Sequence, residues 1–310
     1  MRIELRRKEV CVMSLKYTVL KRVFRILGMQ KRMARPYGEL VRMFGSDRAA
    51  LKIPVLKKKG YETETVTVSD HPVLLIRHRK KVQSLLVFVV GGGMLEYPDR
   101  SQVKSALKLA EKTGRDVAVP YFPLAPEYNL FDALDMLLET YRKMLSLYDS
   151  DDIAFLGGSS GAFMTLCLMS YINEGRKNLP LPGKLYLSSP GSALTDEERK
   201  TAEEKNTSDL IMSTAALDNI FSGMAGGRIL PDWMMYMQRG NYTSLRSAYL
   251  SYGGDEVFSA AAASTAERLR SFGTDVTLEV EEGMYHMYAA LPLVREADGA
   301  YERMIGYLKV

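Results

Sequence analysis

The sequence has few cysteines and histidines and no long apolar run. Its 310 residues include two cysteines, Cys11 and Cys167, and three histidines. Two cysteines so far apart show neither a metal-binding spacing nor a disulfide framework, as is typical of a reduced, intracellular setting. The longest apolar runs are well below the roughly 18 residues that a transmembrane helix needs. We therefore expect a cytoplasmic protein with no metal site.

Internal repeats and low-complexity tracts are also missing, and the composition is that of an ordinary globular protein, 46% hydrophobic and 25% charged. The length suits one large α/β domain with an insertion, or two small domains. A signal peptide is not expected, because basic residues interrupt the N-terminal apolar stretch and no small-residue cleavage site follows it. Met13 is an alternative start to Met1.

Acidic residues are scarce near the N-terminus. The net charge is +5, yet residues 1–60 carry 17 Lys and Arg against 4 Asp and Glu. Apolar residues follow helical spacing there, with basic residues among them: Leu15, Val19, Val23, Ile26 and Leu27, beside Lys16, Lys21, Arg22 and Arg25. Such a segment could contact a membrane surface or a polyanion. We favour a solvated basic face on a helical cap, with no nucleic-acid partner and membrane contact as the weaker alternative.

Beyond residue 60 the chain alternates between strands and helices. Two early antiparallel strands are expected at 63–68 and 71–77, and later strands at 84–90, 116–122, 153–156, 184–189, 247–251 and 276–280. Helices are expected at 99–113, 129–148, 162–173, 259–272 and 291–308. This alternation predicts an α/β fold with a mostly parallel central sheet flanked by helices. Reactive groups in such folds lie beyond the carboxyl ends of the strands.

Residues 190–244 break this alternation. The segment contains the only tryptophan and several methionines: Trp233, Met212, Met224, Met234, Met235 and Met237. Methionine fills irregular apolar space and adapts to varied contacts, which suits a pocket wall. An irregular piece of core would look the same.

A G-x-S-x-G motif separates the strand at 153–156 from the helix that follows it. Its central residue is Ser159, between Gly157 and Gly161. In a strand–turn–helix context this motif forms a sharp turn that exposes the serine oxygen beyond the sheet. The pattern alone is weak, because clusters of glycine and serine are also ordinary turn chemistry. We interpret Ser159 as a nucleophile.

A nucleophilic serine needs a base, and the base needs an orienting acid. His286 follows the last strand and is the candidate base, whereas His71 and His78 lie in the early strands and are expected to be structural. Asp255 follows the preceding strand and its Gly-Gly turn, which favours it over Glu256, Glu281 and Glu282 as the acid. The chain order serine, acid, histidine is that of α/β-hydrolases.

Three consecutive glycines, Gly91 to Gly93, follow the strand at 84–90. Unshielded backbone N–H groups at this place, together with the N–H of Ser160, are suited to hold a developing oxyanion. The alternative is a flexible connection, for which three glycines would carry a large entropic cost.

From about Thr65 to the C-terminus the sequence resembles the hormone-sensitive-lipase-like branch of the α/β-hydrolases, which includes many carboxylesterases. The matching motifs, in order, are Val90-Gly91-Gly92-Gly93, Tyr121 to Tyr128 with its Leu-Ala-Pro-Glu core, Gly157 to Ala162, Gly254-Asp255 and Tyr285-His286. The resemblance implies an α/β-hydrolase fold with Ser159 as nucleophile, Asp255 as acid, His286 as base, and an oxyanion hole made by Gly92, Gly93 and Ser160. It also implies a cap made of residues 1–60 and 190–244, over a catalytic domain of residues 61–310.

Two residues depart from the family pattern. Val90 stands where the family has a histidine that braces the glycine loop, and Gly158 stands where it has an aspartate. Neither position makes or breaks bonds, so we expect a changed rate or substrate preference rather than loss of activity.

These features predict a serine hydrolase that cleaves carboxylic esters, by resemblance small-acyl esters, through an acyl-enzyme and without a cofactor. An amidase, formamidase or arylacetamide-type deacetylase would use the same triad. A non-catalytic small-molecule receptor is a further alternative, favoured only by Val90 and Gly158. The sequence leaves the physiological substrate and a possible homodimer undecided.

Overall fold

The computed structural model describes residues 14–45, 51, 53–175 and 178–310. Cys11 and the alternative start at Met13 lie outside the described residues.

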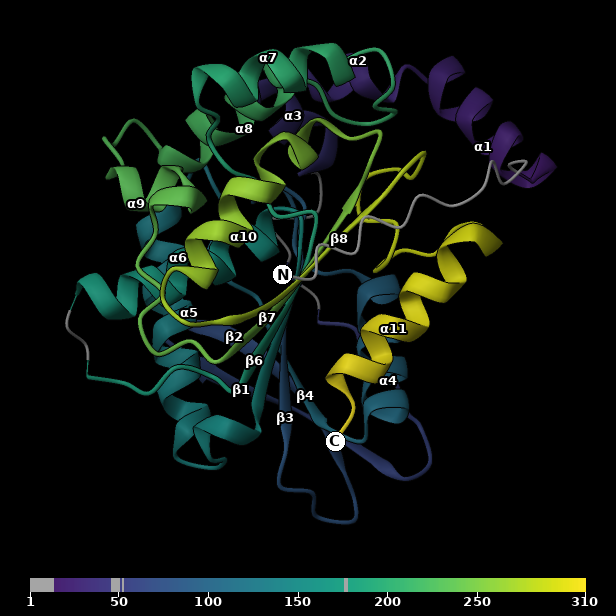
Figure 1. Cartoon of the computed structure of the whole chain (residues 1–310). Helices are drawn as coiled ribbons and strands as arrows, with labels where there is room; N and C mark the ends of the chain where they lie inside the picture. The colour runs from purple at the N-terminus through teal and green to yellow at the C-terminus, as the bar shows by residue number, and fades with distance from the viewer. Residues whose placement is uncertain (1–13, 46–50, 52, 176–177) are drawn as a thin grey trace.

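A single twisted sheet runs through the middle of the protein (Figure 1). Its eight strands in the described chain lie in the order β1-β2-β4-β3-β5-β6-β7-β8, and β2 runs antiparallel to both of its neighbours while the others are parallel. The strands are β1 (Tyr61–Val68), β2 (His71–His78), β3 (Leu85–Val89), β4 (Asp116–Pro120), β5 (Ile153–Gly158), β6 (Lys184–Ser188), β7 (Ser247–Gly253) and β8 (Asp275–Glu281). The expected mostly parallel α/β sheet, with its early antiparallel pair, is confirmed.

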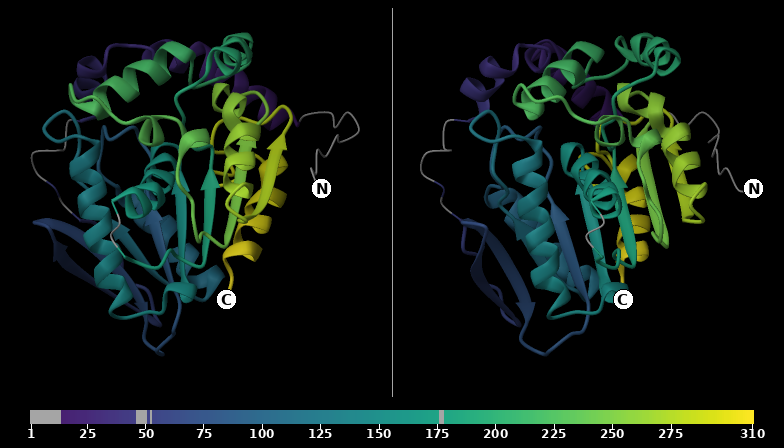
Figure 2. Two further views of the ribbon diagram at one scale, coloured as in Figure 1. Left: turned by 60° about the vertical axis from the view of Figure 1, so that its left-hand side comes forward. Right: turned by 90° about the vertical axis from the view of Figure 1, so that its left-hand side faces the viewer.

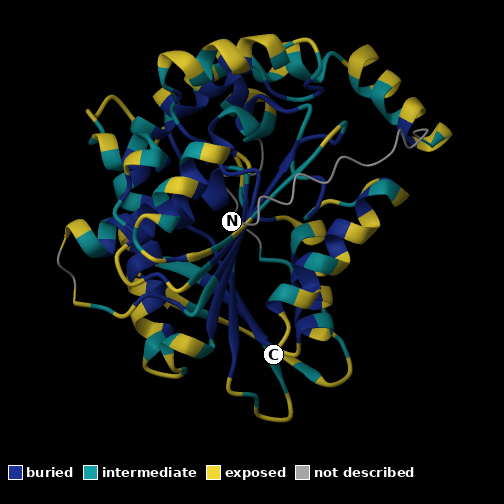
Figure 3. Ribbon diagram, viewed as in Figure 1, coloured by how far each residue is buried: buried dark blue, intermediate teal, exposed yellow. Residues whose placement is uncertain are grey.

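Helices cover both faces of the sheet and give it two apolar cores (Figures 1 and 2). One face carries α4 (Arg100–Thr113) and α11 (Asp298–Leu308), and the other carries α5 (Leu130–Leu145), α6 (Ser160–Glu174) and α10 (Ala262–Arg270). Because the central strands are covered on both sides, their residues are buried almost throughout (Figure 3).

Helix ends follow local sequence signals. Asp99 and Asn129 form capping boxes that start α4 and α5, and Gly114 in the left-handed conformation ends α4. The last helix is shorter than the 291–308 expected from the sequence. It begins at Asp298 because the preceding chain forms a loop in which Tyr285 Oη donates to the Leu291 carbonyl and accepts from the Leu293 N–H.

A third layer of helices lies above the carboxyl ends of the parallel strands (Figure 2). It combines α1 (Leu15–Ile26), α2 (Met29–Met33) and α3 (Tyr37–Phe44) with α7 (Asp196–Lys205) and α8 (Thr214–Ala225), whereas α9 (Asp232–Met235) packs beside α6. Side-chain amides join the two segments. Gln30 donates to the carbonyls of Asn206 and Met212 at 2.7 and 2.8 Å, and Asn219 donates to that of Ala34 at 2.9 Å.

Within the described ranges, none of the helices combines the length and apolar character that crossing a membrane would require.

Gly161, in the first turn of α6, sets how closely that helix approaches β3. A Cβ atom at this position would lie 2.1 Å from the carbonyl oxygen of Val89. Gly161→Ala should therefore force the backbone apart and lower the free energy of unfolding by about 1–3 kcal/mol in urea titrations. Gly306→Ala is the matched control, because that exposed position in α11 has no atom within 4 Å of an added Cβ. It should be stabilising by about 0.5–1 kcal/mol. Equal stability of the two variants would contradict this account.

Candidate active site

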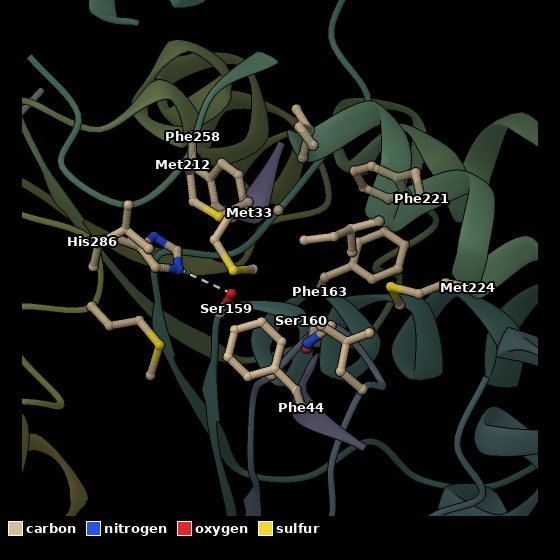
Figure 4. A pocket seen from close by; sticks show the side chains of 18 of the residues that line it. Met33, Phe44, Ser159, Ser160, Phe163, Met212, Phe221, Met224, Phe258 and His286 are labelled. Atoms are coloured by element: carbon tan, nitrogen blue, oxygen red, sulfur yellow. Dashed lines mark hydrogen bonds between the residues drawn. The ribbon is translucent and has the colours of Figure 1, made fainter. Parts of the chain in front are cut away.

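Ser159 occupies the sharp turn between β5 and α6 that the sequence predicts. Its backbone has φ 50° and ψ −122°, a strained conformation for a residue with a side chain. The turn is so tight that a Cβ on Gly157 would lie 2.5 Å from the Cα of Ala162. This geometry directs the serine hydroxyl away from the sheet and into the space below the helical layer (Figure 4).

The predicted pairing of Ser159 with His286 is present. His286 Nε2 lies 3.0 Å from Ser159 Oγ (Figure 4). The imidazole is 7% exposed, and its ring packs edge-on against Phe258, with centroids 4.8 Å apart. A hydrogen bond of this length gives the base direct access to the hydroxyl proton.

The acid partner of His286 is Glu256, not the predicted Asp255. His286 Nδ1 forms a short hydrogen bond with Glu256 Oε2. The other carboxylate oxygen, Oε1, accepts hydrogen bonds from Ser189 Oγ at 2.8 Å and from the Gly253 N–H at 2.7 Å. Glu256 is fully buried, so these donors replace the water that a carboxylate would otherwise need.

Asp255 points toward the helical layer instead. Its carboxylate lies 3.2 Å from Lys21 Nζ of α1, and its backbone carbonyl accepts from Ser208 Oγ at 2.9 Å. The chain turns after Gly253-Gly254, so that consecutive side chains leave in different directions and the second acidic residue faces the histidine. The sequence prediction therefore chose the residue next to the one that contacts His286.

Two acidic groups influence the proton affinity of His286. Burial would lower its pKa, but the charge and hydrogen bond of Glu256, with a contribution from Asp209, raise it above the ordinary value. Asp209 is itself buried, and burial raises its pKa to about 6 although three backbone N–H groups, those of Ile211, Met212 and Val257, donate to it. The bond to Val257 fixes the turn that carries Glu256. Asp209 lacks a recognisable motif, and the sequence did not predict its role.

The glycine loop after β3 packs directly against the serine turn. A Cβ on Gly91 would lie 2.4 Å from the Gly158 carbonyl oxygen, and Gly92 and Gly93 have φ of +117° and +64°. The Gly93 N–H donates to Ser160 Oγ at 2.8 Å. The sequence predicts a role only for the backbone N–H of Ser160, and the position of its hydroxyl is a finding of the structure.

The two departures from the family pattern have structural counterparts. Val90 is buried on the sheet face covered by α4 and α11. The glycine loop is held from the other side, where Tyr37 Oη of α3 donates to the Gly93 carbonyl at 2.9 Å. Gly158 leaves room for Met287, because a Cβ at that position would lie 2.3 Å from the Met287 methyl carbon.

A cavity of about 210 Å³ lies beside Ser159 and His286 (Figure 4). Among the described residues its wall is almost entirely apolar, and Glu96 is the one acidic residue in that lining. The apolar lining consists of Met29, Met33, Phe44, Leu95, Phe163, Ile211, Met212, Leu217, Ile220, Phe221, Met224, Phe258 and Met287. In the described part of the chain no group of three or more His, Cys, Asp or Glu side chains is arranged to hold a metal ion.

The Met-rich segment lines this cavity only in part. Met212 and Met224 face it, whereas Met234 and Met237 are buried elsewhere in the core. Trp233 stacks on Tyr171 with ring planes 16° apart. The contributions of Met29, Met33 and Phe44 were not predicted, because they depend on how the N-terminal helices pack over the sheet.

The other two histidines lie outside the site, as expected. His78 Nδ1 is 3.0 Å from Asp116 Oδ1, and the ring of His71 meets the edge of Tyr128.

Comparison with known proteins bears on the fold. Among curated proteins nothing matches this chain. Solved structures similar to it include EstE5 soaked with p-nitrophenyl butyrate, at 19% identity and a TM-score of 0.79, covering 96% of this chain and 98% of that one. An esterase from the bacterial hormone-sensitive lipase family has 21% identity and a TM-score of 0.77, covering 96% and 99%. A putative esterase from Staphylococcus aureus has 19% identity and a TM-score of 0.76, covering 89% and 94%.

A family model described as alpha/beta hydrolase fold matches residues 86–290. This match spans more than half of the chain and includes the glycine loop, Ser159, Glu256 and His286. The chain therefore belongs to the α/β-hydrolase fold family.

Proposed function

We propose that the protein is a serine esterase in which Ser159, His286 and Glu256 form the catalytic triad. The observation that carries this proposal is the continuous hydrogen-bonded chain from Ser159 Oγ through His286 to the buried carboxylate of Glu256. Ser159 Oγ attacks the ester carbonyl while His286 Nε2 takes its proton and passes it to the leaving alcohol. Water then attacks the acyl-enzyme by the same route in reverse.

The glycine loop and the start of α6 supply the oxyanion hole in this proposal. In this proposal the N–H groups of Gly92 and Ser160 donate to the carbonyl oxygen as it gains charge, and the Gly93 N–H joins them by leaving its hydrogen bond to Ser160 Oγ. Because the Gly93 N–H already meets Ser160 Oγ, that hydroxyl lies close to the developing charge and can donate its own proton toward it. The described helices of the predicted cap segments, α1 to α3 and α7 to α8, form the cap that encloses the substrate in this proposal.

The cavity supports a small or medium apolar acyl group. Its apolar wall would exclude water from the acyl chain, and its volume of about 210 Å³ limits the length of that chain. p-Nitrophenyl butyrate, which was soaked into crystals of the similar EstE5, is a suitable first substrate. A p-nitroanilide with the same acyl group tests the amidase alternative, and we expect the ester to be cleaved faster.

Replacing Ser159 tests the proposal directly. Ser159→Ala should reduce kcat for p-nitrophenyl butyrate by roughly 10⁶-fold, because the covalent route is lost. A fluorophosphonate probe should label the wild-type protein at Ser159 and fail to label the variant. A variant that kept wild-type activity, or a wild-type protein that resisted labelling, would refute the esterase proposal and favour a non-catalytic receptor.

Paired substitutions distinguish the two neighbouring acids. Glu256→Gln should lower kcat by about 10³–10⁴-fold, whereas the kcat of Asp255→Asn should stay within about fivefold of wild type, because this change removes only a partly exposed ion pair.

The pH dependence of activity gives a second test. The free imidazole is the active form of His286, so activity falls as the pH drops through its raised pKa. Removing the Glu256 charge removes the main cause of that increase, so the acidic limb of kcat/KM should move to lower pH in Glu256→Gln only. The opposite pattern would restore Asp255 as the acid.

The hydrogen bond from Tyr37 to the glycine loop can be tested by substitution. Tyr37→Phe removes the hydrogen bond to the Gly93 carbonyl and should reduce kcat by about 2–10-fold with little change in KM. Tyr141→Phe is the matched control, since Tyr141 is also buried and donates to a backbone carbonyl, that of Pro180, away from the site. The free energy of unfolding should fall by a similar amount in both variants. If kcat also fell in Tyr141→Phe, the loss in Tyr37→Phe would not come from the glycine loop.

A further inference from the structure

Much of helix α1 is exposed to solvent (Figure 3), and four of its exposed residues are large and apolar. Leu15 is 80% exposed, Val19 49%, Val23 43% and Ile26 83%. Their spacing of four, four and three residues places them on one face of the helix. This face is a continuous stripe and therefore differs from the single exposed apolar side chains found on any protein surface.

The opposite face of α1 is already occupied, so the helix cannot bury the stripe by rotating. Tyr17 is fully buried and its Oη donates to the Gly283 carbonyl at 2.5 Å. On the same side Lys21 Nζ lies 3.2 Å from Asp255 and 4.7 Å from the centre of the Tyr17 ring. These contacts fix the orientation of α1 and leave the apolar stripe facing outward.

Positive charges flank the stripe. Lys16, Arg22 and Arg25 are exposed on α1, and Lys31 and Arg32 are exposed on α2. Residues 14–44 as a whole contain eight Lys and Arg and one acidic residue, Glu39. A helix with an apolar face bordered by Lys and Arg is the form that inserts shallowly into the headgroup region of a lipid bilayer.

We propose that the outer face of α1, made of Leu15, Val19, Val23 and Ile26 with the flanking Lys16, Arg22 and Arg25, docks on an anionic lipid surface. The charge of the segment favours this occupant over a second copy of the chain. Two copies joined symmetrically through α1 would bring identical cationic helices together, whereas anionic headgroups neutralise them. The inference does not depend on the proposed esterase activity.

The position of α1 gives such docking a consequence for the cavity. The helix lies at one edge of the helical layer (Figures 1 and 2), and Gly28 joins it directly to α2. Met29 and Met33 of α2 line the cavity beside Ser159. A lipid surface held by α1 would therefore lie next to one wall of the cavity.

Co-sedimentation with vesicles tests the docking surface. Full-length protein is mixed with phosphatidylcholine vesicles, or with vesicles containing 30% phosphatidylserine, at low and at physiological salt. The wild type should bind the anionic vesicles, and more weakly as salt rises. The double variant V19S/I26S should reduce partitioning at least about tenfold, and R22Q/R25Q by about fivefold per cation removed.

Leu147→Ser is the matched apolar control. Leu147 is 52% exposed and follows α5 at the opposite end of the sheet, so its removal should leave vesicle binding unchanged. V19S/I26S should keep wild-type kcat on a soluble ester and a wild-type unfolding midpoint. Wild-type protein that fails to bind anionic vesicles would overturn the proposal, as would V19S/I26S that binds like wild type. Self-association that V19S/I26S abolishes, without vesicle binding, would assign the stripe to a second copy instead.

Discussion

The arrangement of the site depends on one buried carboxylate. Glu256 is inaccessible to water, and burying a charge of this kind is costly unless every oxygen has a donor. Ser189, the Gly253 N–H and His286 provide those donors. Because Ser189 also accepts from the Met287 N–H, the strand ends of β6 and β7 and the histidine loop are joined through the same few atoms. The imidazole is consequently held at the angle that brings Nε2 to Ser159.

Much of this could be predicted from the sequence, because it follows from periodicity and strand order. Ser159 and His286 are both placed by loops after parallel strands, and such loops meet at one edge of a sheet. The carboxylate partner of His286 was predicted wrongly for a local reason. Asp255 and Glu256 are adjacent in a turn, and the turn geometry, which composition does not encode, decides which one faces inward. Asp255 instead pairs with Lys21 of the N-terminal segment, a contact between residues far apart in the chain that the local sequence does not indicate.

The cavity and α1 show where prediction from local sequence ends. The helical spacing of apolar residues in 15–27 predicts an amphipathic helix. It does not predict whether the apolar face is buried against the protein or remains exposed to solvent. Tyr17 decides the matter, since a single tyrosine buried against the Gly283 loop turns the aliphatic residues outward. The lining by Met29 and Met33 depends likewise on long-range packing.

Hydrogen bonds join the helical layer to the glycine loop and to the turn that carries Glu256. These bonds limit how the layer can move. Tyr37 of α3 holds the glycine loop, and Asp209, between α7 and α8, holds the turn that carries Glu256. Lys205 adds a bond to the Gly254 carbonyl. Lifting this layer as one body would break the hydrogen bonds that hold the glycine loop and the turn carrying Glu256. For the proposed esterase we therefore expect substrate to enter by local movement of cavity-lining side chains such as the methionines, because the layer that shapes the cavity also orders the proposed catalytic groups.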